Sequence, residues 1–251
     1  MEIVALTALG VGGATAIGAL IGFFFKNPSH KLNDLILSFA AGVMLSAAVV
    51  GLIVPSLELG GSLAVLITAS GIFAGALCLN LIDKLVPHLH KMTGADIEGH
   101  PQGTAKINKV LLFVIAIGIH NLPEGIAAGV AFGTDDISQA LSVSIGIALQ
   151  NIPEGMVIIA PMLAVGMSRA KTLTIALLTG LVEVVGTFIG YFAVSISTAI
   201  LPFALAFAGG TMLYVISDEM IPETHHDNQS GATYSLLLGF VVMLALDFFL
   251  G

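Results

Sequence analysis

The sequence predicts an all-α integral membrane protein, an inverted-repeat helical bundle of eight transmembrane helices. Of its 251 residues, 57% are hydrophobic and only 10% are charged, whereas a soluble domain typically carries about 25% charged residues. The mean hydropathy is +1.03, and a membrane-spanning helix needs about 20 mostly apolar residues. The apolar runs lack the strict alternation of polar and apolar residues that is typical of a transmembrane barrel.

Each predicted span is an apolar run bounded by charged residues or by proline and glycine. From the N-terminus the runs cover residues 3–25, 34–54, 62–86, 108–133, 139–165, 172–197, 201–222 and 232–250. Polar interruptions at 26–33, 87–108 and 223–231 separate them most clearly. We expect a single transmembrane domain over 1–251, with one long cytoplasmic loop at about 87–107.

The basic residues predict the orientation of the chain. They all fall in alternate loops, on one side of this arrangement: Lys26, Lys31, Lys84, Lys91, Lys106, Lys109, Arg169 and Lys171. Because loops rich in Lys and Arg face the cytoplasm, we expect both termini on the extracytoplasmic side. No basic residue precedes the first apolar run, so a cleavable signal peptide is not expected. The scattered basic residues form no basic face, which argues against a nucleic-acid partner.

Several Cys, His and acidic residues can be explained by packing or by solvent exposure as well as by a function. Cys78 lies in an apolar run and predicts a packing residue. The loop histidines could hold a metal loosely, or belong to a solvated linker; they are His88, His90 and His100, and the same applies to His225 and His226. Asp83 and Asp247 stand at span ends, where we expect them at the membrane interface.

Two related motifs stand thirty residues apart in neighbouring predicted helices. The first is His120-Asn-Leu-Pro-Glu124-Gly and the second is Gln150-Asn-Ile-Pro-Glu154-Gly. Because consecutive spans run in opposite directions, the copies can face each other about an approximate two-fold axis, as in inverted-repeat transporters. Residues four apart share a helix face, so His120 aligns with Glu124 and Gln150 with Glu154. Two polar faces can therefore converge.

Proline and asparagine extend the polar character of both motifs. Pro123 and Pro153 each remove one intrahelical hydrogen bond, which leaves a carbonyl oxygen that lipid cannot satisfy. Asn121 and Asn151 lie one step around each helix, so they extend the oxygen-rich surface to a neighbouring site. Hydrogen bonding between helices is the ordinary alternative for a single Asn or Gln in a membrane helix.

Glu183 is a third carboxylate inside a predicted span, and no Lys or Arg lies in the interior of any span. At about 3 kcal/mol each, three ionised and unpaired acids would cost about 9 kcal/mol. A divalent cation or protonation would offset that cost. One imidazole, carboxylates and amides suit zinc, iron(II), manganese or cobalt better than copper(I). We expect Met44 to pack in the apolar core, and the alternative is that it is a metal ligand.

With these residues in view, the chain resembles the ZIP (Zrt/Irt-like) family of divalent metal transporters, most closely its bacterial GufA-like branch. The two motifs carry the resemblance, and Glu183 and the run at 217–223 add to it. The resemblance implies a binuclear site midway through the membrane, bridged by Glu124 and Glu154. His120 and Gln150 would complete one site, approached by Met44; Asn121, Asn151 and Glu183 would complete the other. It also implies a homodimer and an elevator-like or rocking exchange between outward-open and inward-open states.

We therefore expect a multi-pass cell-membrane importer, in the bacterial inner membrane, of divalent transition-metal ions. Zinc is the first candidate, followed by iron, manganese, cobalt and cadmium, and no resident cofactor is expected. Acids at the outer side would concentrate cations and acids at the inner side would receive them: Glu58, Asp135 and Asp136, then Asp218, Glu219 and Glu223. The alternatives are a proton-coupled exporter and an integral-membrane metalloenzyme, which the lack of His-Glu-x-x-His disfavours.

Overall fold

The protein folds as a bundle of long helices. The computed structural model describes residues 1–25, 29–85, 103–134, 136–225 and 229–250, with side chains except those of 83, 85, 103–116 and 229. Every regular element in these ranges is a helix. Seven helices in the described part of the chain are long and apolar enough to cross a membrane, as expected for a multi-pass membrane protein.

The helices follow one another along the chain with short connections. In order they are α1 (Glu2–Gly22), α2 (His30–Ser46), the π-helical segment η1 (Ala47–Ile53), α3 (Val54–Leu59), the 3₁₀ turn η2 (Gly61–Leu63), α4 (Ala64–Leu85), α6 (Gly103–Ala131), α7 (Ile137–Ala164), α8 (Arg169–Ile196), the 3₁₀ turn η3 (Thr198–Ile200), α9 (Leu201–Val215), the π-helical segment η4 (Ile216–Met220), α10 (Ile221–Thr224) and α11 (Gln229–Leu250). Two predicted spans are thus composite: α2 continues through η1, and α9 through η4.

Each predicted span coincides with helical structure to within a few residues. Seven of these spans satisfy the length and hydropathy criteria within the described residues. The one remaining predicted span, 108–133, corresponds to α6. This helix has 29 residues, and the structure does not describe the side chains of 103–116. The all-helical membrane fold is confirmed, and the count of eight spans stays a prediction.

Polar caps and one glycine define where several helices begin and end. The side chains of Ser29, Asp136 and Ser168 accept backbone N–H groups in the first turns of α2, α7 and α8. Such caps satisfy donors that have no partner within the helix. Gly166, after α7, has φ of 84°, a left-handed conformation that favours glycine. These residues explain why adjacent spans separate so sharply.

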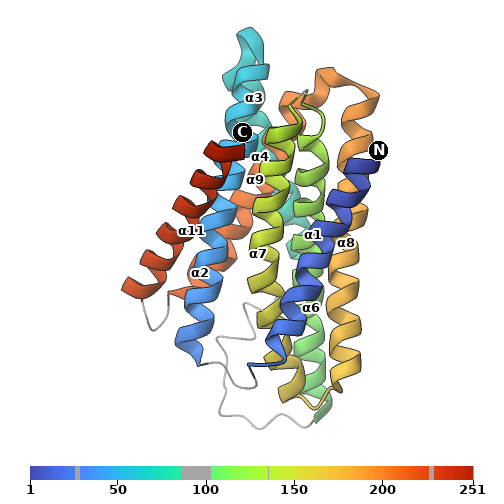
Figure 1. Cartoon of the computed structure of the whole chain (residues 1–251), viewed down its shortest axis with the longest axis vertical. Coiled ribbons are helices and arrows are strands. Elements are labelled where there is room, and N and C mark those ends of the chain that lie inside the picture. The colour runs from blue at the N-terminus through green and yellow to red at the C-terminus, as the bar shows by residue number, and fades with distance from the viewer. Residues whose placement is uncertain (26–28, 86–102, 135, 226–228, 251) are drawn as a thin grey trace.

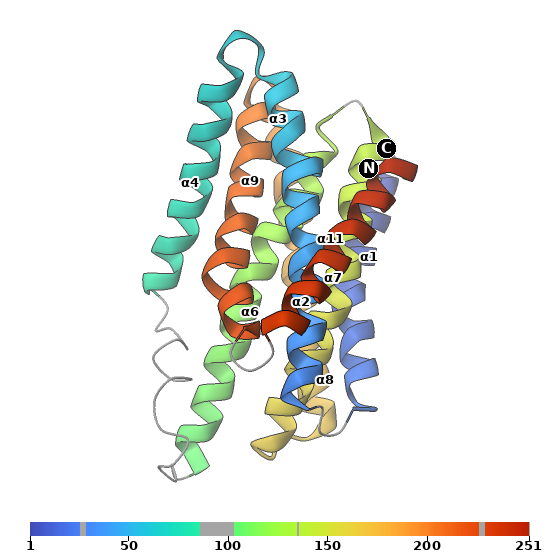
Figure 2. The ribbon, with the colours of Figure 1, turned by 90° about the vertical axis from the view of Figure 1, so that its left-hand side faces the viewer.

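The bundle is built from closely packed helix pairs. Helix α1 packs against α7 and α8, and α8 packs against α6, whereas α4 packs on α9 and α11 on α2. Figures 1 and 2 show the two chain ends at one end of the bundle. In Figure 1 the first turns of α2, α6 and α8 lie at the opposite end. The basic residues of α2 and α8, Lys31, Arg169 and Lys171, belong to those turns.

The largest apolar core lies at the centre of the bundle. It includes Met44 and Leu52 from the second span, Ile147 from α7, and Leu205 and Met212 from α9, all fully or nearly fully buried. The outer helices are different: only 11% of the most apolar stretch of α11 is buried, and 22% of that of α4. Their exposed apolar faces suit contact with lipid. The centre of the bundle, where several of the motif residues also lie, is therefore shielded from its surroundings.

Candidate metal centre

The structure brings the motif residues of α6 and α7 together with Glu183 of α8. Five of these side chains are no more than 1% exposed: Asn121, Glu124, Gln150, Asn151 and Glu183. His120 and Glu154 are half-buried. Both helices run through their motif prolines without interruption. The predicted convergence of two polar helix faces is therefore present in the fold.

The carboxylate of Glu183 accepts hydrogen bonds from three different helices. Thr15 of α1 donates its hydroxyl to Oε1 at 2.7 Å, and Asn121 of α6 donates Nδ2 to the same atom at 2.5 Å. Asn151 of α7 donates its Nδ2 to Oε2. Hydrogen bonds to a charged acceptor are stronger than those between neutral groups. This network offsets part of the desolvation cost of a buried carboxylate.

A second contact joins the two motifs directly. Gln150 Nε2 donates to Glu124 Oε1 at 2.8 Å. The carboxylates of Glu124, Glu154 and Glu183 interact electrostatically with one another, and Glu154 also interacts with His120. The centre therefore gathers three carboxyl groups among amide groups inside the bundle.

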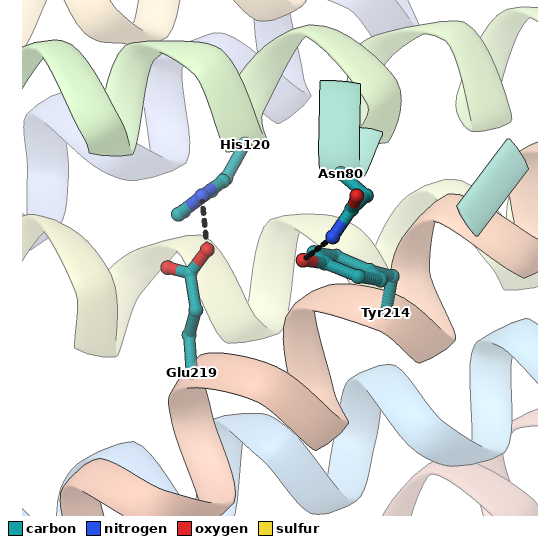
Figure 3. A network of polar contacts seen from close by, with 4 residues as sticks. All are labelled: Asn80, His120, Tyr214 and Glu219. Carbon is teal, nitrogen blue, oxygen red and sulfur yellow. Dashed lines mark hydrogen bonds and ion pairs between the residues drawn. The ribbon is translucent and has the colours of Figure 1, made fainter. Parts of the chain in front are cut away.

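His120 faces a residue that the sequence pattern does not pair with it. Its Nε2 lies 2.9 Å from Oε1 of Glu219, in η4. Figure 3 shows these two side chains pointing toward each other from α6 and η4, beside a second contact in which Asn80 of α4 donates to the hydroxyl of Tyr214 at 2.8 Å. Glu219, expected only as an inner-side acid, thus belongs to the surroundings of the motif.

Four buried oxygen atoms of the motif residues have no hydrogen-bond partner within the described part of the chain. They are Asn121 Oδ1, Asn151 Oδ1, Gln150 Oε1 and Glu124 Oε2. An unsatisfied buried acceptor costs about 1–3 kcal/mol. Carboxylate and amide oxygens are also ligands that divalent cations accept. The donor set fits a divalent cation, which would satisfy oxygens that the described residues leave unpaired.

The bridged binuclear arrangement itself stays a prediction. Among the residues that the structure describes, no three His, Cys, Asp or Glu side chains are arranged to hold a metal ion. In this arrangement Glu183 and Glu124 are held by protein donors, and His120 by Glu219. Met44 is fully buried in the central apolar core, as the packing interpretation predicts, and its role as a ligand is untested.

The other predicted polar residues lie away from this centre. Glu58, Asp136, Asp218 and Glu223 are exposed, and Asp136 caps α7. Asp247 accepts a hydrogen bond from Ser142 at 2.9 Å, and His225 contacts the carbonyl of Ile221 at 2.8 Å. Cys78 is half-buried in α4. Several predictions fall outside the described residues or side chains: His88, His90, His100, His226, Asp135 and Asp83.

Thr15 is the residue of this centre that the motif analysis misses. A single Thr in an apolar span has an ordinary packing interpretation, and the signal lies instead in its neighbours. The stretch Gly12-x-x-Thr15-x-x-Gly18 in α1 has the same spacing as Gly180-x-x-Glu183-x-x-Gly186 in α8. Comparing the first and sixth predicted spans would have paired Thr15 with Glu183.

The motif glycines explain how the helices come close enough for these contacts. A Cβ atom at Gly125 would lie 2.2 Å from the carbonyl oxygen of Glu183, and one at Gly155 would lie 2.1 Å from that of Thr15. Any larger residue would push the helices apart, because backbone atoms cannot rotate away. Small residues permit such close approach of membrane helices.

The chain is similar to known proteins over most of its length. A family model described as "ZIP Zinc transporter" matches residues 93–247. The chain is 42% identical to the zinc transporter GufA of Myxococcus xanthus, over 98% of each chain. It is 37% identical to the zinc transporter ZIPB of Bordetella bronchiseptica, over 95% of this chain and 78% of that one. It is 36% identical to the zinc transporter ZupT of Chlorobaculum parvum, over 95% and 94%.

Proposed function

The chain belongs to the ZIP zinc transporter family, and on that premise we propose that it imports zinc through the polar centre between α6, α7 and α8. Its relatives are zinc transporters by name. Its long apolar helices suit a bilayer. The centre is buried among those helices rather than at a surface, as a transport site requires.

The unpaired oxygens carry this proposal. Four buried acceptor atoms of the motifs, three amide oxygens and one oxygen of Glu124, have no partner in the described part of the chain. A fixed structural network would be expected to pair such atoms. A passing dication would satisfy the oxygens and neutralise the acids in one step. In this mechanism Glu124 and Glu154 bridge two ions. The site of one ion is completed by His120 and Gln150. The site of the other ion is completed by Asn121, Asn151 and Glu183.

The direction of transport follows from the charge of the ion. Two positive charges moving through about 100 mV, negative inside, gain roughly 4.6 kcal/mol. The membrane potential therefore favours import. A site that binds tightly must also release its ion, so the ligands must separate or become hydrated in a second state. The pairing of His120 with Glu219 and of Glu124 with Gln150 supports a state in which these ligands are held by protein partners.

The same proposal includes the topology. The chain crosses the membrane eight times, by α6 and the seven other apolar spans, and both termini lie outside the cytoplasm. It is supported by Lys31, Arg169 and Lys171, which lie in helix turns at the end of the bundle opposite to the termini. In a Cys78→Ala background, an impermeant thiol reagent should label Glu2→Cys on intact cells. Ser29→Cys should react only after permeabilisation; the reverse pattern would invert the topology.

Zinc flux into proteoliposomes tests the function. Wild-type protein should take up zinc faster under an inside-negative potential, and Glu124→Ala or Glu154→Ala should abolish uptake. Glu2→Ala, which removes an exposed acid with no expected role in transport, is the matched control and should retain uptake. Normal uptake by the two motif variants would refute their assignment. Iron(II), manganese, cobalt and cadmium in the same assay define selectivity, and proton-driven efflux would favour the exporter.

A further inference from the structure

Helices α1 and α8 share the spacing of two glycines around a central polar residue, and they contact each other at equivalent positions. Their equivalent residues are 168 positions apart, the separation of Thr15 and Glu183. Gly12 and Gly180 approach each other, so that a Cβ on either would lie 2.3 Å from the carbonyl oxygen of the other. The two helices therefore meet at matching positions.

The same equivalence governs how α1 and α8 meet the motif helices. A Cβ at Gly18 would lie 2.1 Å from the carbonyl oxygen of Ile152, and a Cβ at Gly186 would lie 2.6 Å from that of Leu122. Ile152 and Leu122 are the third residues of the two motifs. Helix α1 thus packs on α7 as α8 packs on α6, and Thr15 occupies the position that Glu183 holds in the other repeat.

The hydrogen bonds of the motif asparagines obey this symmetry too. Asn121 Nδ2 donates to the carbonyl of Thr179 at 3.3 Å, and Asn151 Nδ2 donates to that of Val11 at 3.2 Å. Val11 and Thr179 are equivalent residues of α1 and α8. Both amide nitrogens also donate to Glu183. The Oδ1 oxygen of each amide has no hydrogen-bond partner among the described residues.

We propose that Thr15 is a positioning residue of the ion site. Its hydroxyl, 2.7 Å from Glu183 Oε1, holds the carboxylate where it accepts both motif amides, so that both Oδ1 atoms are presented to the ion. A hydroxyl achieves this without adding charge. A second carboxylate at this position would repel Glu183, and a cationic side chain would compete with the ion.

The inference rests on the proposed function and is tested by two substitutions with opposite expectations. Thr15→Val keeps the shape and removes the donor, and should raise both the zinc dissociation constant and the KM of uptake about tenfold or more. Thr15→Ser keeps the donor and should stay near wild type. Thr187→Val is the matched control, because Thr187 donates at 2.9 Å to the backbone carbonyl of Glu183 rather than to its carboxylate.

The outcomes separate the inference from the function it rests on. If Thr15→Val behaves like wild type, the hydroxyl has no positioning role and the inference fails. A defect in Thr15→Ser alone would assign Thr15 to packing against α7, which also overturns it. Should Thr15→Val not fold, Thr15→Ala and Thr15→Ser make the same comparison. If wild-type protein itself neither binds nor transports zinc, the proposed function fails instead.

Discussion

Two adjacent glycines of α1 should respond in opposite ways to the same substitution. At Gly12 a Cβ atom would lie 2.3 Å from the carbonyl oxygen of Gly180, whereas at Gly13 no described atom lies within 4 Å. Ordinary contacts of a Cβ begin at 3.4 Å. Gly12→Ala therefore has to move α1 and α8 apart by about 1 Å, because the nearest atom, the carbonyl oxygen of Gly180, belongs to the backbone and cannot rotate away.

The expected energies follow from two opposing effects. Replacing Gly by Ala in a helix stabilises it by about 0.5–1 kcal/mol, and overpacking costs about 1–3 kcal/mol. Gly13→Ala should therefore gain up to about 1 kcal/mol, and Gly12→Ala should lose up to about 2 kcal/mol. A separation of about 1 Å would also lengthen the 2.7 Å contact between Thr15 and Glu183 beyond hydrogen-bonding distance, so zinc affinity should fall.

Thermal unfolding in detergent, followed with and without zinc, measures both effects. Gly12→Ala should melt below wild type and Gly13→Ala at or above it. Combining Gly12→Ala with Thr15→Val should weaken zinc binding by less than the sum of the single effects, because both remove the same contact. If Gly12→Ala melts at or above Gly13→Ala, the close approach of α1 and α8 is wrong.

Three further substitutions or conditions test other contacts. Asn151→Asp replaces a hydrogen-bond donor to Glu183 with a further acid beside it. It should destabilise the zinc-free protein by about 1–3 kcal/mol and enlarge the increase in Tm on zinc addition. An unchanged zinc-free Tm would contradict the contact between Asn151 and Glu183. Tyr214→Phe removes the acceptor of Asn80 and should cost about 0.5–1.5 kcal/mol without altering zinc uptake; a loss of uptake would show that this contact does more than join α4 to α9. Zinc at 100 times its dissociation constant should stabilise wild type by about 2.7 kcal/mol, reversed by a chelator, whereas Glu124→Ala should gain almost nothing.

The spans and the motif faces could be predicted because each depends on local sequence. An apolar run of about 20 residues has few alternatives to a membrane helix, and residues four apart share a face wherever the helix lies. Glu124 and Gln150 could therefore be assigned to converging surfaces before any packing was known.

The remaining contacts depend on how distant helices pack. Glu219 reaches His120 only because η4 lies beside α6, and no local pattern indicates that approach. The π-helical segments at Ala47–Ile53 and Ile216–Met220 likewise have no clear residue signal, although Pro55 and Pro222 follow them. Thr15 lacks a local signal for a different reason. The stretch with matching glycine spacing surrounds Glu183, which lies 168 positions further along the chain.

The contacts at Gly125 and Gly155 limit how this centre can be modified. Backbone meets backbone at both positions, so no side chain there can be shortened to bring α6 closer to α8 or α7 closer to α1. A substitution at either glycine can therefore only separate the helices, which would break the contacts of the centre. A variant with a new preference among metal ions must obtain it by exchanging donor atoms, nitrogen for oxygen or charged for neutral, rather than by changing the size of the cage.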